Sequence, residues 1–146
     1  MNQYIMIDNE SFWLDDVKLR YYFGPEPRID LFADCHDLQM AGIAINCISL
    51  INSINKVEDV QDKLIVVGNQ DQVASFDINI ANKENEIGES VICKPGQVLE
   101  INKLRITLGK INDGFINIIL EGMCESLEGF IEVKSELSAR IFDETR

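Results

Sequence analysis

The chain has 146 residues and a mass of 16.6 kDa, and its 25 acidic and 13 basic side chains give a formal net charge of −12. A chain of this charge repels polyphosphate and anionic lipid, so we expect neither a nucleic-acid partner nor a membrane partner. Because 46% of the residues are hydrophobic, the composition excludes a disordered acidic tail. It predicts a single acidic domain over residues 1–146.

Targeting signals and cysteine usage both predict a cytoplasmic protein. The longest apolar-rich run, residues 40–54, is interrupted by polar residues and falls short of a membrane span. The N-terminus has neither a basic region nor a cleavable apolar region. Cysteines stand at positions separated by 12, 46 and 31 residues, without a C-x-x-C pair: Cys35, Cys47, Cys93 and Cys124. We expect reduced, mostly buried thiols and no zinc site.

Alternation of apolar and polar residues with period two is the main structural signal, and it is typical of strands with one buried face. It first appears in a strand that ends at Gly24-Pro25-Glu26-Pro27, because proline fixes φ and removes a donor. The expected inward side chains of this strand are Trp13, Val17, Leu19, Tyr21 and Phe23. The uncharged segment 40–51 is typical of a central strand covered on both faces. Residues 55–62 predict either a helical turn, with Asn55 as its cap and Glu58 three residues later, or a polar loop.

The second half of the chain continues the alternation. Residues 75–80 form the cleanest example, and residues 81–90 predict a long surface loop. The next inward candidates are Leu99, Ile101, Leu104, Ile106 and Leu108. Their phase breaks at Asn102-Lys103, which we interpret as a bulge or turn, and Asn112-Asp113-Gly114 predicts a hairpin turn. Residues 131–141 predict one or two C-terminal strands.

These segments predict an all-β fold, because the chain lacks the crossover helices that a parallel α/β sheet needs. We expect an antiparallel two-sheet sandwich, or a partly open barrel, of roughly nine to eleven strands with at most one short helix.

No sequence motif identifies a reaction. Nucleotide-binding and nucleophile-elbow motifs are missing, and His36 is the only histidine. It belongs to the cluster Asp34-Cys35-His36-Asp37, which we interpret as a polar turn, with a metal site or a catalytic thiol as alternatives. Adjacent strand residues point to opposite faces, so Cys35 and His36 face one site only if this segment is a turn. We therefore expect no catalytic residue, no metal and no cofactor.

The acidic surplus is spread unevenly along the chain. Residues 1–40 and 41–90 each carry a net charge of −5, residues 91–120 carry +2 and residues 121–146 carry −4. If the fold gathers part of this charge on one face, that face attracts a basic protein and accelerates its association.

The sequence therefore favours a non-enzymatic protein-binding domain, such as a bacterial immunity protein or antitoxin that neutralises a basic nuclease toxin. The partner-binding candidates are loop and edge carboxylates together with two aromatic anchors: Asp34, Asp37, Glu84, Glu86, Glu89, Tyr22 and Phe130. One alternative is a structural subunit that pairs through strand edges, with the long C-terminal run that ends at residues 141–146 as the expected edge. The other is an enzyme or metal-binding domain that uses the 34–37 cluster. The oligomeric state does not follow from the sequence.

Overall fold

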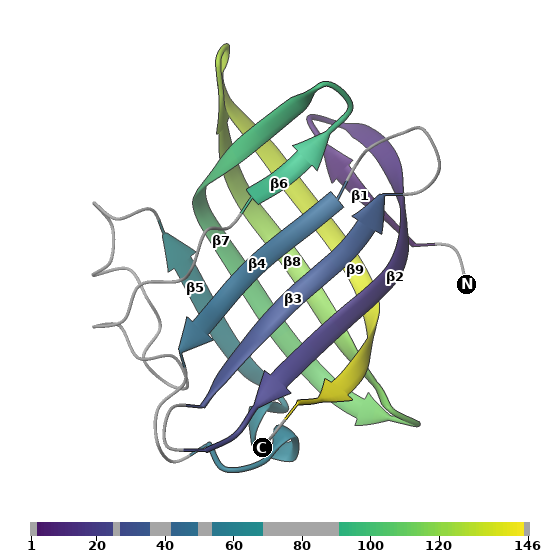
Figure 1. Cartoon of the computed structure of the whole chain (residues 1–146). Coiled ribbons are helices and arrows are strands. Elements are labelled where there is room, and N and C mark those ends of the chain that lie inside the picture. The colour runs from purple at the N-terminus through teal and green to yellow at the C-terminus, as the bar shows by residue number, and fades with distance from the viewer. Residues whose placement is uncertain (1–2, 25–26, 36–41, 50–53, 69–90, 145–146) are drawn as a thin grey trace.

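The computed structural model describes residues 3–24, 27–35, 42–49, 54–68 and 91–144. Nine strands lie within these ranges: β1 (Gln3–Ile7), β2 (Glu10–Tyr22), β3 (Arg28–Cys35), β4 (Gly42–Ser49), β5 (Lys63–Gly68), β6 (Val91–Lys94), β7 (Gln97–Asn112), β8 (Phe115–Ser126) and β9 (Gly129–Asp143). A single turn of 3-10 helix spans Val57–Val60. All nine strands belong to one sheet that curves round on itself (Figure 1).

Hydrogen bonding closes this sheet into an eight-stranded barrel. Round the ring the strands follow the order β7-β6-β4-β3-β2-β1-β9-β8, and β8 pairs back onto β7. β5 pairs with residues 103–108 of β7, next to the stretch of β7 that pairs with β6. Each of the eight ring strands therefore has a hydrogen-bonded neighbour on both sides.

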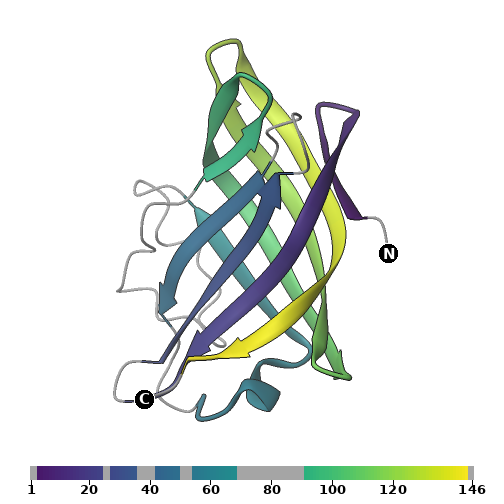
Figure 2. The ribbon, with the colours of Figure 1, turned by 45° about the vertical axis from the view of Figure 1, so that its right-hand side comes forward.

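The short strand β1, which we call the wedge, is inserted between β2 and β9 in this ring. It pairs antiparallel with both β2 and β9, and so separates these two long strands over part of their length. Beyond the wedge, residues 18–21 of β2 pair directly and in parallel with residues 140–143 of β9. Figure 2 shows the hairpin of β1 and β2 standing against β9. The wedge thus joins the first and last strands of the chain.

Aliphatic side chains fill the interior of the barrel. Each of the eight ring strands contributes at least one side chain that is no more than 1% exposed, for example Ile5, Leu19, Leu31, Ile45, Ile92, Leu104, Ile118 and Leu137. An eight-stranded barrel is just wide enough to be filled by side chains in this way. The inside of the barrel is therefore a hydrophobic core, and polar chemistry is left to the outer surface and the two ends.

The all-β prediction is confirmed, and nine strands and one short helical turn are observed. The two-sheet sandwich is wrong, because the sheet closes into a single barrel. Period-two alternation reports that a strand has one buried face, and both architectures have such strands. What separates them is strand pairing, and the deciding pairs, β2 with β9 and β4 with β6, join distant parts of the sequence.

Several local predictions are confirmed. The five inward candidates between residues 99 and 108 are buried, and the register of β7 shifts between Ile101 and Lys103 as the phase break indicated. The hairpin turn lies between β7 and β8, where Asp113 and Gly114 have φ values of 53° and 81°. Residues 75–80 and the predicted loop 81–90 lie outside the described residues.

The inward position of Trp13 was predicted wrongly. Trp13 is 40% exposed, whereas its neighbours Phe12 and Leu14 are buried. The cause is an irregularity in β2 between Asp15 and Lys18, where Asp16 has a φ of 50°. An extra residue of this kind exchanges the two faces of a strand, so Trp13 and the later inward residues have opposite orientations.

The lower end of the barrel is covered by the 3-10 helix (Figure 1). Its residues Val57 and Val60 are buried, and the carboxylate of Asp59 accepts backbone hydrogen bonds from Asn55 and Lys56 at 3.0 and 3.3 Å. The predicted helical turn is thus confirmed, but Lys56 occupies the N-cap position and Asp59, not Glu58, supplies the capping carboxylate. No helix within the described ranges is long and apolar enough to cross a membrane.

Tyr21 lies at the same end and contacts the ring of Phe23 at 4.7 Å between centroids. Burial, a hydrogen bond between its hydroxyl and Asp143, and the negative charges of Asp143 and Glu58 raise the pKa of Tyr21 from 10.0 to about 12. The neutral phenol is therefore part of the structure that links the end of β2 to the end of β9.

Gly122 provides the first test of the barrel. A Cβ atom at this position would lie 2.1 Å from the backbone oxygen of Lys103, so Gly122→Ala must push β7 and β8 apart. We expect a loss of about 2 kcal/mol in unfolding free energy, or about 4–8 °C in melting temperature. Gly24→Ala is the control, because nothing lies within 4 Å of its Cβ position, and it should change little. Equal stability of the two variants in urea unfolding would show that β7 and β8 do not approach this closely.

Alkaline unfolding tests the Tyr21 contact. Between the unfolded pKa of 10.0 and the folded pKa of about 12, the unfolded chain releases the Tyr21 proton while the folded chain keeps it. Unfolding free energy should therefore fall as the pH rises through this range. Tyr21→Phe should remove about 1 kcal/mol at neutral pH and should make the alkaline fall smaller, as measured by urea unfolding at several pH values. The control is Tyr4→Phe, and an identical alkaline fall in both variants would refute the contact with Asp143.

Candidate functional site

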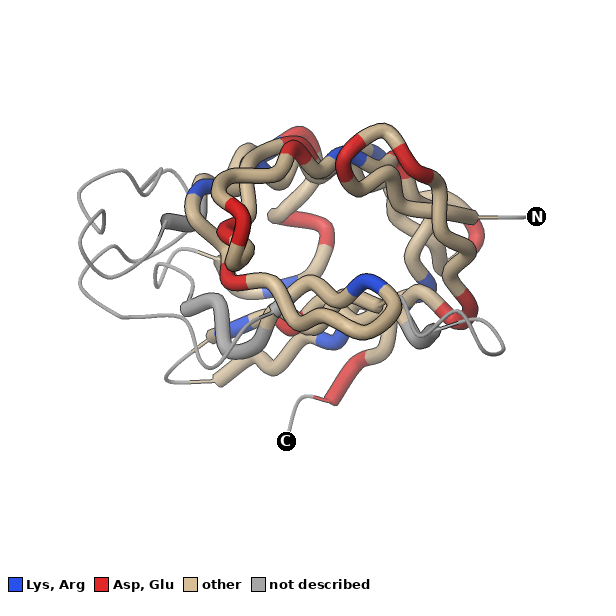
Figure 3. Tube along the Cα trace, turned by 90° about the horizontal axis from the view of Figure 1, so that it is seen from above, with Lys and Arg blue, Asp and Glu red and all other residues tan. Residues whose placement is uncertain are grey.

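Acidic side chains gather on the outer side of β8 and β9. Six exposed glutamates lie there and on the adjoining part of β7: Glu100, Glu121, Glu125, Glu128, Glu132 and Glu136. We call these six residues, together with the exposed Leu127 and Phe130, the acidic face. Two cations pair with it, Arg105 at 3.7 Å from Glu121 and Lys134 at 3.9 Å from Glu132. Figure 3 shows the distribution of charged positions when the barrel is viewed from above. This part of the surplus charge therefore forms a patch.

Strand register places like charges side by side at the centre of the acidic face. Glu125 of β8 lies directly opposite Glu100 of β7 on one side and opposite Phe130 of β9 on the other. Like charges in directly opposed positions destabilise a sheet. Within the described part of the chain, no Lys or Arg forms an ion pair with either glutamate. This arrangement therefore favours the arrival of an external cation.

The hairpin that joins β8 to β9 carries two apolar side chains into solvent. Leu127, at its tip, is 100% exposed and Phe130 is 63% exposed. The hydroxyl of Ser126 orders the turn, since it donates to the backbone oxygen of Gly129 at 2.9 Å and accepts from the backbone of Glu128 at 3.2 Å. An ordered turn presents these side chains at a small entropic cost on binding.

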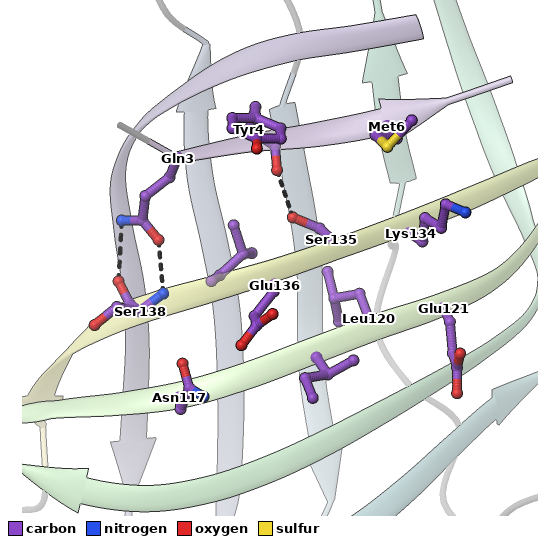
Figure 4. Close-up of a pocket in the computed structure, with 12 residues that line it drawn as sticks. Gln3, Tyr4, Met6, Asn117, Leu120, Glu121, Lys134, Ser135, Glu136 and Ser138 are labelled. Atoms are coloured by element: carbon purple, nitrogen blue, oxygen red, sulfur yellow. Dashed lines mark hydrogen bonds between the residues drawn. The ribbon is translucent and has the colours of Figure 1, made fainter. Parts of the chain in front are cut away.

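A groove of about 510 Å³ continues the acidic face towards β1 (Figure 4). Glu121, Glu136 and Lys134 supply its charges, and Tyr4 and Ile119 supply exposed apolar surface. Trp13 extends this apolar surface, because its ring meets that of Tyr4 edge to face at 6.5 Å. Ligand pockets of this size usually combine apolar walls with a few polar groups, and this groove has both.

Beside the groove, the first two residues of β1 do not pair with β9, because the pairing of these strands begins at Ile5. There the side-chain amide of Gln3 replaces the backbone hydrogen bonds of a strand pair. It donates to the Ser138 backbone oxygen at 3.1 Å and accepts from the Ser138 backbone nitrogen at 2.6 Å. The hydroxyl of Ser135 donates to the backbone oxygen of Tyr4 at 2.6 Å. Figure 4 shows these bonds along one wall of the groove. Gln3 and Ser135 thus hold the wall in place.

The structure describes the side chains of two of the seven predicted partner-binding residues, Phe130 and Tyr22. Phe130 is exposed, as predicted, and lies opposite Glu125 near the hairpin end of the acidic face. Tyr22 is half-buried on a different part of the barrel, where Arg28 stacks on its ring at 4.3 Å. The backbone of Asp34 pairs with Asp15 inside β3, so Asp34 and Cys35 end a strand, contrary to the turn that we predicted for them. The remaining candidates lie outside the described residues: Asp37, Glu84, Glu86 and Glu89.

Sequence reasoning missed the other members of the acidic face, although part of the signal was present. The four strand glutamates from residue 121 to residue 136 occupy positions that alternate with the buried residues of β8 and β9. This alternation places them outside, but their convergence depends on the register of three strands.

The described residues can be searched for clusters of metal-ligating side chains and for reactive thiols. No three His, Cys, Asp or Glu side chains in these ranges lie close enough together to hold a metal ion. Burial raises the pKa of the Cys124 thiol from 9.0 to about 12, so this buried cysteine stays protonated and unreactive at neutral pH. His36 and Asp37 of the 34–37 cluster lie outside the described residues.

No protein-family model matches this chain, and comparisons with curated proteins and with solved structures find no significant match. The functional argument therefore depends on the surface itself.

Gln3 provides a test of the groove. In Gln3→Ala the half-buried backbone of Ser138 loses both side-chain partners, and we expect a loss of about 1 kcal/mol in unfolding free energy and faster hydrogen exchange at the Ser138 amide. The control is Asn117→Ala: Asn117 lines the same groove, and its side chain forms no hydrogen bond with the described residues. Unchanged exchange at Ser138 in the Gln3 variant would rule out this anchoring role.

Proposed function

We propose that this protein is a non-enzymatic protein-binding domain of the immunity or antitoxin type, and that it neutralises a basic protein through the acidic face. The observation that carries the proposal is the row Glu100, Glu125 and Phe130. In it, two glutamates that form no ion pair with the described residues stand beside an exposed aromatic ring. Aromatic anchors in the centre of an interface supply most of its binding energy, and surrounding charges supply steering and selectivity.

Binding of a basic partner to the acidic face would proceed in steps. The glutamates attract a cationic surface at long range and so raise the association rate. On contact, Arg or Lys side chains of the partner neutralise Glu100 and Glu125 and relieve their mutual repulsion. Phe130 and Leu127 then enter apolar hollows of the partner and slow dissociation. The groove beside Tyr4 accepts a further side chain, since Ile119 suits an aliphatic stem and Glu136 suits a cationic head.

A structural subunit that assembles through strand edges receives less support. The segment that we expected to be an edge belongs to β9 up to Asp143, and there β9 pairs with β2 along residues 140–143. On its other side β9 pairs with β8 from Gly129 to Arg140. Closure of the barrel thus occupies the hydrogen-bonding groups that this kind of assembly would use.

The proposal is tested by capturing the partner from the native host, identifying it by mass spectrometry and measuring its binding as a purified protein. We expect a basic protein, bound about tenfold or more weakly by Phe130→Ala, mainly through faster dissociation. Phe115→Ala is the matched control, since Phe115 is also exposed on the outer side of the hairpin strands but lies at the far end of β8.

Charge reversal separates steering from anchoring. The double variant Glu125→Lys and Glu132→Lys should slow association, and the difference from the wild-type protein should shrink as salt is added. Asp62→Lys and Asp113→Lys, at the opposite end of the barrel, form the control. Recovery of no basic protein, or equal binding by all of these variants, would contradict the proposed function.

A further inference from the structure

Cations and aromatic rings alternate on the outer side of β3, β2 and β9, where these three strands are neighbours. Seven side chains make up this surface, which we call the arginine face: Lys18, Arg20, Tyr22, Arg28, Phe32, Arg140 and Phe142. In register, Lys18 of β2 lies between Phe32 and Arg140, and Arg20 lies beside Phe142. One step further along β2, Tyr22 lies opposite Arg28. Every cation on this surface therefore has an aromatic neighbour.

Each arginine of this face stacks on a ring. The guanidinium carbon lies 4.3 Å from the ring centre in the pair Arg28 and Tyr22. It lies 4.9 Å from the ring centre in Arg140 and Phe142, and 5.4 Å in Arg20 and Phe32. Stacking uses one plane of the guanidinium and fixes its orientation, which leaves its N–H edge and its other plane for a ligand.

The hydrogen-bonding capacity of this surface is only partly used. Asp16 lies 2.8 Å from the Lys18 ammonium and 3.5 Å from the Arg140 guanidinium. Arg20 and Arg28 form no ion pair with the described residues. The Nε atom of Arg20 is buried and does not reach solvent, so only the outer part of this guanidinium is available to a ligand. The acid that faces Arg20 across the strands is Asp30, which is 7% exposed. Glu144 adds a third acid at the end of this surface, since it is exposed and its backbone nitrogen donates to the Tyr21 oxygen at 2.9 Å. Four cations thus face three acids, and the surface keeps a small positive surplus.

At physiological salt, the sign of the net charge close to the ligand determines which ligands such a surface attracts. The Debye length is about 8 Å there, so charges on other parts of the barrel are largely screened from a ligand at this face. The net charge of −12 led us to expect no nucleic-acid partner, but that charge belongs to the whole chain. The acidic face and the arginine face therefore act on ligands separately.

We propose that the arginine face binds single-stranded nucleic acid. Outward side chains on a strand recur at roughly 6.7 Å, which is comparable with the step of an extended single strand. Phosphates would meet the N–H edges of the arginines, and bases would stack on the rings and the guanidinium planes. An acidic peptide would use the cations alone, whereas this face alternates the two kinds of contact that a single strand requires.

Fluorescence anisotropy of the full chain with a labelled oligo(dT) or oligo(U) of about 12 nucleotides tests the proposal. The double variant Arg28→Gln and Arg140→Gln should bind at least tenfold more weakly, because two stacked donors are lost. The matched control is Arg105→Gln: Arg105 is 51% exposed and Arg140 is 55% exposed, and each has one carboxylate partner. With about three phosphate contacts, raising salt from about 50 to about 200 mM should weaken wild-type binding about twentyfold.

Other outcomes would overturn the proposal. These are an absence of binding at low salt, equal binding by the double variant, and equally tight binding of a duplex of the same length. A polyglutamate peptide that displaces the oligonucleotide at matched charge would instead identify an acidic protein as the ligand. Arg28→Lys keeps the charge and loses the planar stack, so it should fall between the wild-type protein and the double variant. Glu125→Lys should leave the arginine face intact, which separates this test from that of the acidic face.

Discussion

Closure of the sheet is the constraint on which the rest of this structure depends. Eight strands reach a complete ring because β1 fills the space between β2 and β9 and then ends, so that β2 and β9 meet directly. The ring removes most free edges, and its interior becomes a filled aliphatic core. Gly122 supports closure locally, since only a residue without a side chain lets β7 and β8 approach there.

A filled barrel leaves the outer surface for recognition, and the two surfaces described above follow from this division. Outward positions of β7, β8 and β9 bring glutamates together around Phe130, and outward positions of β3, β2 and β9 bring arginines together with aromatic rings. Both surfaces use cross-strand neighbours at fixed spacing. The same backbone register thus determines the stability of the sheet and the chemistry of its faces.

The sequence predicted the class of fold and the burial of individual side chains better than it predicted either surface. The positions from Leu99 to Leu108 were assigned correctly, because period-two alternation is a direct consequence of the pleat. Trp13 was assigned to the wrong face, because a local irregularity at Asp16 reverses the alternation and has no simple sequence signal. Phe130 was recognised from its parity, but its neighbour Glu100 depends on the shift in β7. The arginine face unites residues from the two ends of the chain, which only strand pairing reveals.

Cross-strand proton contacts at non-local joints of the ring test the account most directly. In a labelled sample, nuclear Overhauser effects should connect the backbone protons of Ile43 with those of Ile92, and those of Lys18 with those of Arg140. Observation of both sets in the same folded species is the result that a closed barrel predicts. The absence of the contacts between Ile43 and Ile92, or of all contacts from β9 to both β1 and β2, would open the ring into a sandwich or an incomplete barrel and would contradict the placement of both surfaces.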